Sequence, residues 1–250
     1  MDLNSTENNS FLVIDQGNTL IKLALFENHN IRWIRSFSSF NETEAEALLK
    51  ETNNIKGAII SSVSNAPEKI TRLLDSFKWI VLDHNTPVPI QNKYTTPETL
   101  GKDRLAGIVA ASQMFPGNDI LVIDAGTAIT YDFINKDKEY IGGSISPGLN
   151  LRFKALNTFT ARLPLYEASN FHMLTGSSTY ESILSGVMQG AILEMDGFIA
   201  EYKNKYSDLV TILTGGDAIY FDKKLKSDIF ASENLVLDGL NLILKYNLEK

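Results

Sequence analysis

A short segment near the start of the chain carries residues whose types and spacing suit the binding of phosphate. The segment Asp15–Thr19 follows an apolar run and has a glycine two residues after the acid, and Lys22 lies three residues beyond its end. Such a turn offers a carboxylate, open space at the glycine and backbone N–H groups for phosphate oxygens. We expect Lys22 to neutralise a terminal phosphate and Asp15 to hold Mg²⁺ through water. The candidate nucleotide-binding residues here are Asp15, Gly17, Asn18, Thr19 and Lys22.

The same arrangement recurs later in the chain. Val122–Ala128 repeats Val13–Thr19, with an apolar run, an acid at its end (Asp124) and a glycine two residues later. One such turn is usually only a turn, but two copies in matching contexts favour a pair of loops that clamp one triphosphate, with Thr127 as a hydroxyl donor. From these residues alone, Asp124 is a candidate for the catalytic base.

A third glycine-rich turn follows the predicted buried strand Leu209–Leu213. Its residues Gly215 and Gly216 are candidates for binding the adenosine part of a nucleotide, although such junctions between a strand and a helix are also common for packing reasons. The chain has no Walker A sequence and no Gly-x-Gly-x-x-Gly followed by a suitable helix, so neither P-loop nor Rossmann chemistry is indicated.

The segment Leu100–Arg104 combines a carboxylate with a guanidinium group. Transfer of a phosphoryl group to an alcohol requires an acceptor for the hydroxyl proton, usually a carboxylate, and Asp103 is the best candidate. The neighbouring Arg104 can hold a substrate carboxylate with two parallel hydrogen bonds. The alternative is that these two residues form an exposed helix pair that contributes little energy.

The hydrophobic pattern predicts the elements that position these residues. Each half opens with a β-hairpin, and apolar residues recur at helical spacing in the second half. The predicted strands are Phe11–Asp15, Leu20–Glu27, Asn30–Phe37, Gly57–Val63, Ile120–Asp124, Ala128–Ile134, Glu139–Ile145 and Leu209–Leu213. The predicted helices are Asn41–Thr52, Pro67–Phe77, Pro97–Met114, Thr179–Tyr206 and Asp238–Leu248.

The repeat and the mixed pattern together predict an α/β fold of two similar halves with a nucleotide cleft between them. We expect a loose polar tail over residues 1–10, an N-terminal half over residues 11–117 and a C-terminal half over residues 118–250.

Composition limits the classes of partner. The chain has 250 residues, 44% of them hydrophobic, with a formal net charge of −7 and no cysteine. The negative charge argues against a nucleic-acid partner, and the lack of cysteine excludes disulfides and thiolate chemistry. With no signal-peptide pattern and no expected membrane span, we predict a soluble, cytoplasmic protein without a membrane partner. His29, His84 and His172 have no ligand-like spacing and are predicted to be surface or loop residues.

The two Asp-x-Gly turns resemble the phosphate loops of the acetate and sugar kinase, heat-shock ATPase and actin superfamily. Further segments resemble, in order and spacing, the type III pantothenate kinases from Phe11 almost to the C-terminus: Leu100–Arg104, Gly142–Gly148, Thr160–Pro164 and Thr214–Gly216. The resemblance implies a duplicated ribonuclease-H-like (actin-like ATPase) fold. It also implies ATP-dependent phosphorylation of the primary hydroxyl of pantothenate to 4′-phosphopantothenate, the first step of coenzyme A biosynthesis, by a homodimer.

The resemblance also implies residue roles. Asp103 becomes the proton acceptor, Thr127 contacts ATP, and Asp124 helps to bind a monovalent cation, K⁺ or NH₄⁺, beside the Mg²⁺ of ATP. The implied pantothenate-binding residues are Tyr94, Gly101, Lys102, Asp103, Arg104 and Thr179. The plainer interpretations are a half-buried loop aromatic for Tyr94 and a helix N-cap for Thr179. Lys102 and Gln16 are small departures from the family pattern.

Other functions remain open at this point. One is a sugar-type kinase or a phosphatase of the same superfamily, against which the small size counts. The other is a non-catalytic regulatory or transcription-accessory protein of the same fold, against which the intact acids and the negative charge count. The long apolar helix is expected to lie in the core, or to face a second subunit where Gly186 and Gly190 allow close approach.

Overall fold

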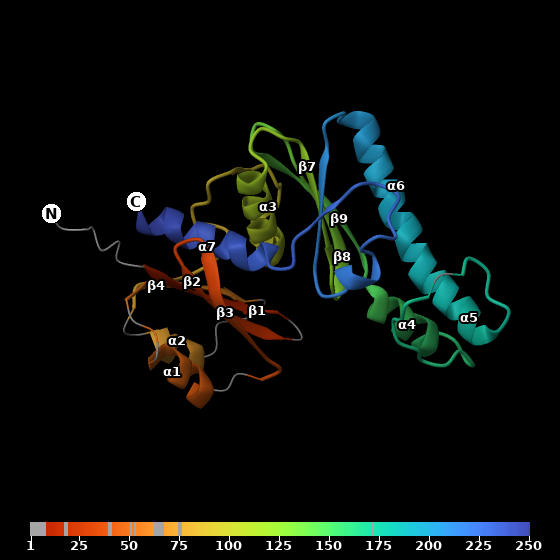
Figure 1. The fold of residues 1–250 in the computed structure, drawn as a ribbon, viewed down its shortest axis with the longest axis horizontal. Helices are drawn as coiled ribbons and strands as arrows, with labels where there is room; N and C mark the ends of the chain where they lie inside the picture. The colour runs from red at the N-terminus through yellow and green to blue at the C-terminus, as the bar shows by residue number, and fades with distance from the viewer. Residues whose placement is uncertain are drawn as a thin grey trace. The chain divides into compact units, whose positions relative to one another are not determined.

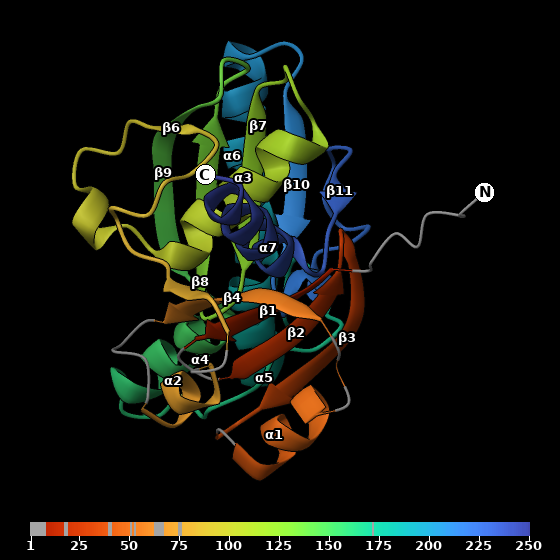
Figure 2. The same ribbon diagram turned by 90° about the vertical axis from the view of Figure 1, so that its left-hand side faces the viewer.

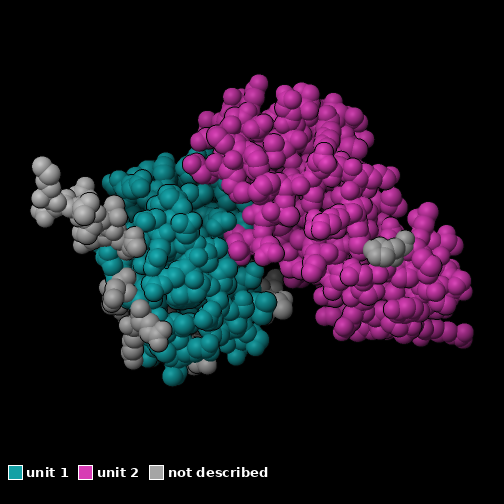
Figure 3. Space-filling view, in the orientation of Figure 1, with its two compact units in different colours: residues 1–90, 95–110, 235–250 teal, residues 91–94, 111–234 magenta. Residues whose placement is uncertain are grey.

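The computed structural model describes residues 9–17, 20–39, 42–50, 52, 54–62, 68–74, 77–171 and 173–250. The chain forms two compact units, coloured separately in Figure 3. Unit 1 comprises residues 1–90, 95–110 and 235–250, and unit 2 comprises residues 91–94 and 111–234. Unit 1 therefore contains both the N-terminal sheet and the C-terminal segment, residues 235–250. Each unit is built from segments that are not contiguous in the sequence.

Unit 1 contains a five-stranded sheet in the order β3-β2-β1-β4-β5. The predicted hairpin is present, because the alternating residues of β1 pair antiparallel with β2, and β3 continues the antiparallel ladder. β4 and β5 run parallel to β1 on its other side. The strands are β1 (Ser10–Gln16), β2 (Ile21–Glu27), β3 (Asn30–Phe37), β4 (Ile55–Ser62) and β5 (Trp79–Val81). Ser10 of the predicted tail therefore already belongs to a strand.

Helices cover both faces of the unit 1 sheet (Figures 1 and 2). Leu12 and Ile14 of β1 share a buried cluster with residues of α1 and α2, on one face. α7 packs against β1 and β4 on the opposite face, where Gly239 allows it to approach the backbone of Ala106 in α3. The helices are α1 (Glu42–Lys50), α2 (Glu68–Leu74), α3 (Lys102–Met114, in unit 1 up to residue 110) and α7 (Leu235–Leu248).

Unit 2 repeats this topology. Its sheet has the order β11-β10-β7-β8-β9-β6, in which β7, β8 and β9 are antiparallel neighbours and β10 runs parallel to β7. Strands β7 to β11 thus correspond one by one to β1 to β5, with β6 added at one edge. The strands are β6 (Gln91–Asn92), β7 (Ile120–Ala125), β8 (Ala128–Ile134), β9 (Glu139–Pro147), β10 (Val210–Thr214) and β11 (Phe230–Ala231). This correspondence confirms the predicted duplicated α/β fold.

One long helix, Thr179–Lys205, packs along the unit 2 sheet (Figure 1). It consists of α5 (Thr179–Leu184), the π-helical segment η2 (Ser185–Gln189) and α6 (Gly190–Lys205). Together with α4 (Leu149–Thr158), it covers a buried cluster that includes Tyr131 of β8 and Phe153 of α4. By length and composition this helix is apolar enough to cross a membrane, but half of its most apolar window is buried in the protein, as expected for a core helix.

The predicted helix Pro97–Met114 is wrong in its first turns. Pro97–Thr99 forms a 3₁₀ turn, Leu100 is extended with φ −66° and ψ 129°, and the α-helix begins only at Lys102. This break separates the segment Leu100–Arg104 into a loop and a helix start. The predicted helix over Pro67–Phe77 is observed as α2, and Pro67 itself lies outside the described residues.

Candidate active site

A cavity of about 390 Å³ in unit 1 gathers candidate residues from distant parts of the sequence. It lies where β1 and β4 end, and the 3₁₀ turn and the start of α3 supply its other walls. The carboxyl ends of parallel strands meet at the same edge of a sheet, which brings the two strand ends together. The predicted site residues that line this cavity are Asp15, Gly17, Gly101, Lys102 and Asp103.

The surroundings of the Asp15 carboxyl group shift its pKa. Burial raises its pKa, and the charge of Asp103 raises it further, while a hydrogen bond with Ser61 and the charge of Lys22 act in the opposite direction. The net pKa lies above the ordinary value of 3.8. Lys22 pairs directly with Asp15 across the β1–β2 ladder. Asp15 and Lys22, both predicted from the sequence as site residues, are therefore cross-strand neighbours in one sheet.

The start of α3 presents Asp103 at the cavity. Its Oδ1 accepts a hydrogen bond from the backbone N–H of Arg104 at 2.8 Å. A side chain on Gly101 would meet this same oxygen at 2.5 Å, so the glycine makes room for the carboxylate. Arg104 is only 8% exposed, whereas Asp103 is exposed. The interpretation of the two residues as an exposed surface pair is therefore wrong for Arg104.

The two departures from the family pattern converge on one residue. The Nζ of Lys102 donates a hydrogen bond to the backbone carbonyl of Ser62 at 2.7 Å. The hydroxyl of Ser62 donates to Oε1 of Gln16 at 2.9 Å. These bonds tie the end of β1, the end of β4 and the first turn of α3 together. Sequence reasoning missed Ser61 and Ser62, although both end a buried run that leads to the same sheet edge as Asp15.

The second Asp-x-Gly turn has the matching position in unit 2. Asp124 lies near the end of β7 and pairs with Thr214 of the parallel strand β10, as Asp15 pairs with Ser61 of β4. Gly215 has a φ of +97°, and a side chain there would collide with Oδ1 of Asp124 and the carbonyl of Ala125. The turn after β10 therefore packs directly on the Asp124 turn, so the packing role considered for this glycine is real.

The neighbouring loop is held just as closely. The backbone N–H of Gly148 donates to the carbonyl of Thr127 at 3.2 Å, and a side chain on Gly148 would collide with the carbonyls of Gly126 and Thr127. Thr127 is exposed, while Gly126 is partly buried. Unit 2 thus brings together Asp124, Thr127 and Gly215, with Gly216 next in the chain and open space around its Cβ position.

Tyr94 and Thr179 both belong to unit 2. The Tyr94 ring stacks on Tyr140 with a centroid distance of 6.1 Å and lies over Gly142, so it is the partly buried loop aromatic that the plainer interpretation expected. Thr179 is exposed and is not the N-cap, which is a correction. Ser178 caps the helix, because its side chain accepts a hydrogen bond from the N–H of Glu181.

The predictions for Asn18, Thr19 and His172, and that of a loose tail as far as it concerns residues 1–8, lie outside the described residues. His84 is exposed, and the exposed His29 contacts the Nζ of Lys245 at 3.0 Å. Within the described part of the chain, no group of three or more His, Cys, Asp or Glu side chains is arranged to hold a metal ion. The Asp15 carboxylate in the cavity nevertheless suits a Mg²⁺ ion, which typically binds one or two carboxylates and substrate phosphates.

Comparison with known proteins decides the family. The family described as type III pantothenate kinase matches residues 11–201. A type III pantothenate kinase of Phocaeicola vulgatus is 47% identical over 239 residues, which cover 94% of this chain and 98% of that protein. The chain belongs to the type III pantothenate kinase family.

Two solved structures share the fold of this type III pantothenate kinase family member. A Campylobacter jejuni protein described as a Baf family transcriptional activator matches with a TM-score of 0.63 at 21% identity, over 96% of this chain and 100% of that chain. A glucokinase from an Antarctic psychrotroph matches with a TM-score of 0.50 at 12% identity, over 95% and 99% of the two chains. At these identities the likeness concerns the fold, which is that of the actin-like ATPases.

Proposed function

We propose that this protein transfers the γ-phosphoryl group of ATP to the primary hydroxyl of pantothenate, giving 4′-phosphopantothenate for coenzyme A biosynthesis. Membership of the family supports the substrate, and one observation supports the chemistry. That observation is the cavity that both carboxylates line, Asp15 from the end of β1 and Asp103 from the start of α3. Phosphoryl transfer to an alcohol needs both a site for Mg²⁺ and an acceptor for the hydroxyl proton.

The proposed pantothenate contacts centre on the start of α3. Asp103 accepts the proton of the attacking hydroxyl, and Arg104 binds the pantothenate carboxylate through its guanidinium fork. Arg104 is only 8% exposed, so packing holds its guanidinium group in one orientation at the start of α3. Gly101, Lys102, Tyr94 and Thr179 complete the proposed substrate-binding set.

The proposed ATP contacts come from the glycine-rich turns that the sequence predicts to bind nucleotide. Lys22 neutralises the terminal phosphate, and the backbone of the turns binds phosphate oxygens. Asp15 would hold Mg²⁺ through water, and the ion would offset part of the negative charge of the phosphates. Asp124 holds a monovalent cation, K⁺ or NH₄⁺, through oxygen ligation. The full proposed set is Asp15, Gly17, Asn18, Thr19, Lys22, Thr127, Gly215 and Gly216, with Asp124 for the cation.

We further propose that the enzyme works as a homodimer in the cytoplasm. Unit 2 supports this proposal with exposed apolar side chains around an apolar pocket that is lined by α4 and η2. Phe159 beside that pocket is 85% exposed, and Leu193 on the following helix is 52% exposed. Gly186 lines the same pocket and has open space around its Cβ position, which suits close approach of a second subunit.

The assignment is tested by coupled ATP-consumption assays with pantothenate and with a panel of hexoses and N-acetylated hexosamines, in buffers that contain Mg²⁺. We expect turnover with pantothenate alone, and faster turnover in K⁺ than in Na⁺ because of the cation at Asp124. Turnover with a sugar in place of pantothenate would make the protein a sugar kinase of the superfamily. Equal rates in K⁺ and Na⁺ would remove the cation role from Asp124.

A further inference from the structure

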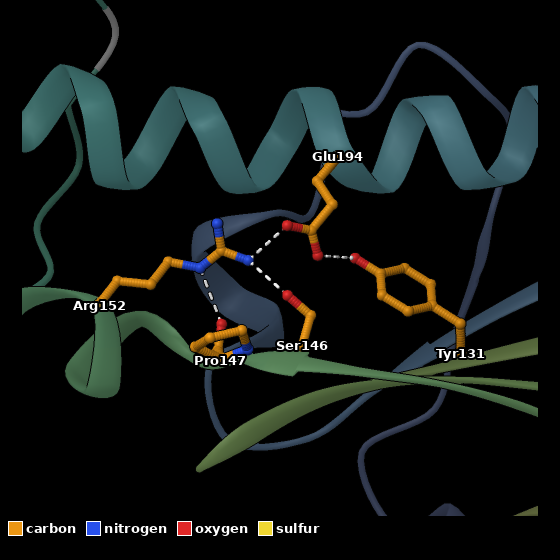
Figure 4. Close-up of polar contacts among 5 residues, drawn as sticks. All are labelled: Tyr131, Ser146, Pro147, Arg152 and Glu194. Atoms are coloured by element: carbon orange, nitrogen blue, oxygen red, sulfur yellow. Dashed lines mark hydrogen bonds and ion pairs between the residues drawn. The ribbon is translucent and has the colours of Figure 1, made fainter. Parts of the chain in front are cut away.

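A polar network in unit 2 links α4, α6, β8 and β9 (Figure 4). Arg152 of α4 binds Glu194 of α6, with Nη2 and Oε2 at 2.6 Å. The same nitrogen donates to the hydroxyl of Ser146 at the end of β9, at 2.8 Å. The Nε of Arg152 donates to the carbonyl of Pro147 at 2.7 Å. Three hydrogen bonds from one planar guanidinium group leave it a single orientation.

The Pro147 carbonyl connects this network to the Thr127 turn. That carbonyl and the N–H of Gly148 belong to one peptide group, which is planar and rigid. The N–H donates to the carbonyl of Thr127, so Arg152 and Thr127 bind opposite ends of the same peptide group. A cation at the carbonyl polarises the peptide and strengthens its N–H as a donor. The position of the Thr127 turn therefore depends on the orientation in which Arg152 holds the Pro147–Gly148 peptide group.

Glu194 keeps the guanidinium group in place. Its other oxygen accepts a hydrogen bond from the hydroxyl of Tyr131 at 2.8 Å. Burial acts to raise the pKa of Glu194, but the hydrogen bonds from Arg152, Ser146 and Tyr131 outweigh it and hold the pKa below its ordinary value. Tyr131 is fully buried and stacks on Phe198 at a centroid distance of 4.0 Å, so the far end of the network is fixed in the core.

We infer that Arg152 is a positioning residue for ATP: it fixes the Pro147–Gly148 peptide that holds the Thr127 turn against the nucleotide. The inference rests on the proposed role of Thr127 in binding ATP. Arg152 acts through the peptide group and makes no contact with substrate. It therefore affects the site for ATP, while the pantothenate contacts at the start of α3 in unit 1 do not depend on it.

The test compares Arg152→Ala, Arg152→Lys and Glu194→Gln with the parent and with Lys154→Ala, which removes an exposed cation from the same helix. We expect the KM for ATP to rise about tenfold in Arg152→Ala, as for loss of a charge-assisted hydrogen bond, with the KM for pantothenate unchanged within twofold. Arg152→Lys should retain most of the defect, because an ammonium group cannot serve Pro147, Ser146 and Glu194 together. Low millimolar guanidinium should restore part of the ATP affinity of Arg152→Ala, and equal urea should not.

Other results overturn the inference. A KM for ATP within twofold of the parent in both Arg152 variants, or equal rises of both KM values, assigns Arg152 a purely structural role. If Arg152→Ala does not fold, Arg152→Lys and Glu194→Gln decide the question on the same criterion. Calorimetric titration with MgATP separates this inference from the proposed function: a parent that binds ATP but does not phosphorylate pantothenate refutes the function, and the ATP affinities of the variants still test Arg152.

Discussion

The carboxylates of Asp15 and Asp103 share one cavity, and the charge of Asp103 is among the causes that raise the pKa of Asp15. Two acids so close serve different tasks only if their surroundings differ. Asp15 is half-buried beside Ser61 and Lys22, which suits a group that holds a cation. Asp103 is exposed at the start of a helix, which suits a group that meets an incoming hydroxyl.

Asp103→Asn should remove turnover while it leaves ATP binding nearly intact, because an amide keeps the shape of the side chain but cannot accept the proton. The expected fall in kcat is about 10²–10⁴-fold, the usual contribution of general base catalysis. Steady-state kinetics together with calorimetric titration of MgATP measure the two effects. Glu98→Gln is the matched control, since Glu98 is an exposed carboxylate that lines the same cavity. If Glu98→Gln is inactive and Asp103→Asn is active, the roles are reversed.

Asp15→Asn should stabilise the fold while it impairs catalysis. The raised pKa of Asp15 means that above pH 3.8 the group ionises in the unfolded chain before it ionises in the folded protein. The free energy of unfolding therefore falls as pH rises through the folded pKa, and this cost is fully present near neutral pH. Removing the charge should raise Tm by about 2–4 °C for each kcal/mol recovered, in a domain of this size.

Thermal unfolding of Asp15→Asn and parent at a series of pH values checks this sign. The difference in Tm should be largest near neutral pH and should shrink as pH falls toward 3.8. A variant that is less stable than the parent at neutral pH would mean that the bonds to Ser61 and the charge of Lys22 outweigh the burial of Asp15.

At the level of the elements, the two glycines of the turn after β10 should differ in how well they tolerate a side chain. Gly215→Ala should destabilise the protein by at least about 1–3 kcal/mol, because φ is +97° and the new methyl group would strike Asp124 and Ala125. Gly216→Ala has open space and should leave Tm unchanged. Thermal unfolding of the two variants measures this difference. Any rise in the KM for ATP in Gly216→Ala then reports a nucleotide contact, whereas equal loss of Tm in both variants contradicts the packing argument.

The tether at the start of α3 predicts a different kinetic signature. Lys102→Met removes the bond to the carbonyl of Ser62, so the first turn of α3 and Asp103 lose their fixed distance from β4. We expect kcat to fall about tenfold, or about 1.4 kcal/mol of transition-state stabilisation, with a smaller change in the KM for pantothenate. A rise in that KM at constant kcat would instead mean that Lys102 acts only as a member of the proposed substrate-binding set and that its bond to Ser62 does not position Asp103.

Sequence pattern predicted most strands because alternation and chain reversals are local signals. It predicted one helix over Pro97–Met114, because residue propensities do not reveal that the backbone of Leu100 is extended. The break lies next to Gly101, which makes room for the side chain of Asp103. It missed α4, which buries only Leu149 and Phe153, and it missed the two-residue strands β6 and β11. The π-helical turn at Ser185–Gln189 shifts backbone bonds without disturbing the apolar spacing that predicted the helix.

Across the whole molecule, the repeat of two Asp-x-Gly turns predicted the duplicated sheet because each copy sits at the end of an equivalent strand. The placement of α7 with unit 1 was not predictable, because it depends on contacts remote in sequence. Gly239 lies against Ala106, and the side-chain amide of Asn241 donates to the carbonyl of Asn28 at 3.3 Å. The candidate residues could be selected from their types, but their supporting bonds, such as Ser62 to Gln16, required coordinates.

The proposed function requires that the γ-phosphoryl group of ATP moves to pantothenate and not to water. Phosphorus NMR of a reaction that contains the protein, MgATP, K⁺ and pantothenate follows both fates at once. We expect a phosphomonoester signal that grows in step with ADP and is absent with Asp103→Asn. Inorganic phosphate in step with ADP, or no consumption of ATP with pantothenate present, would contradict it.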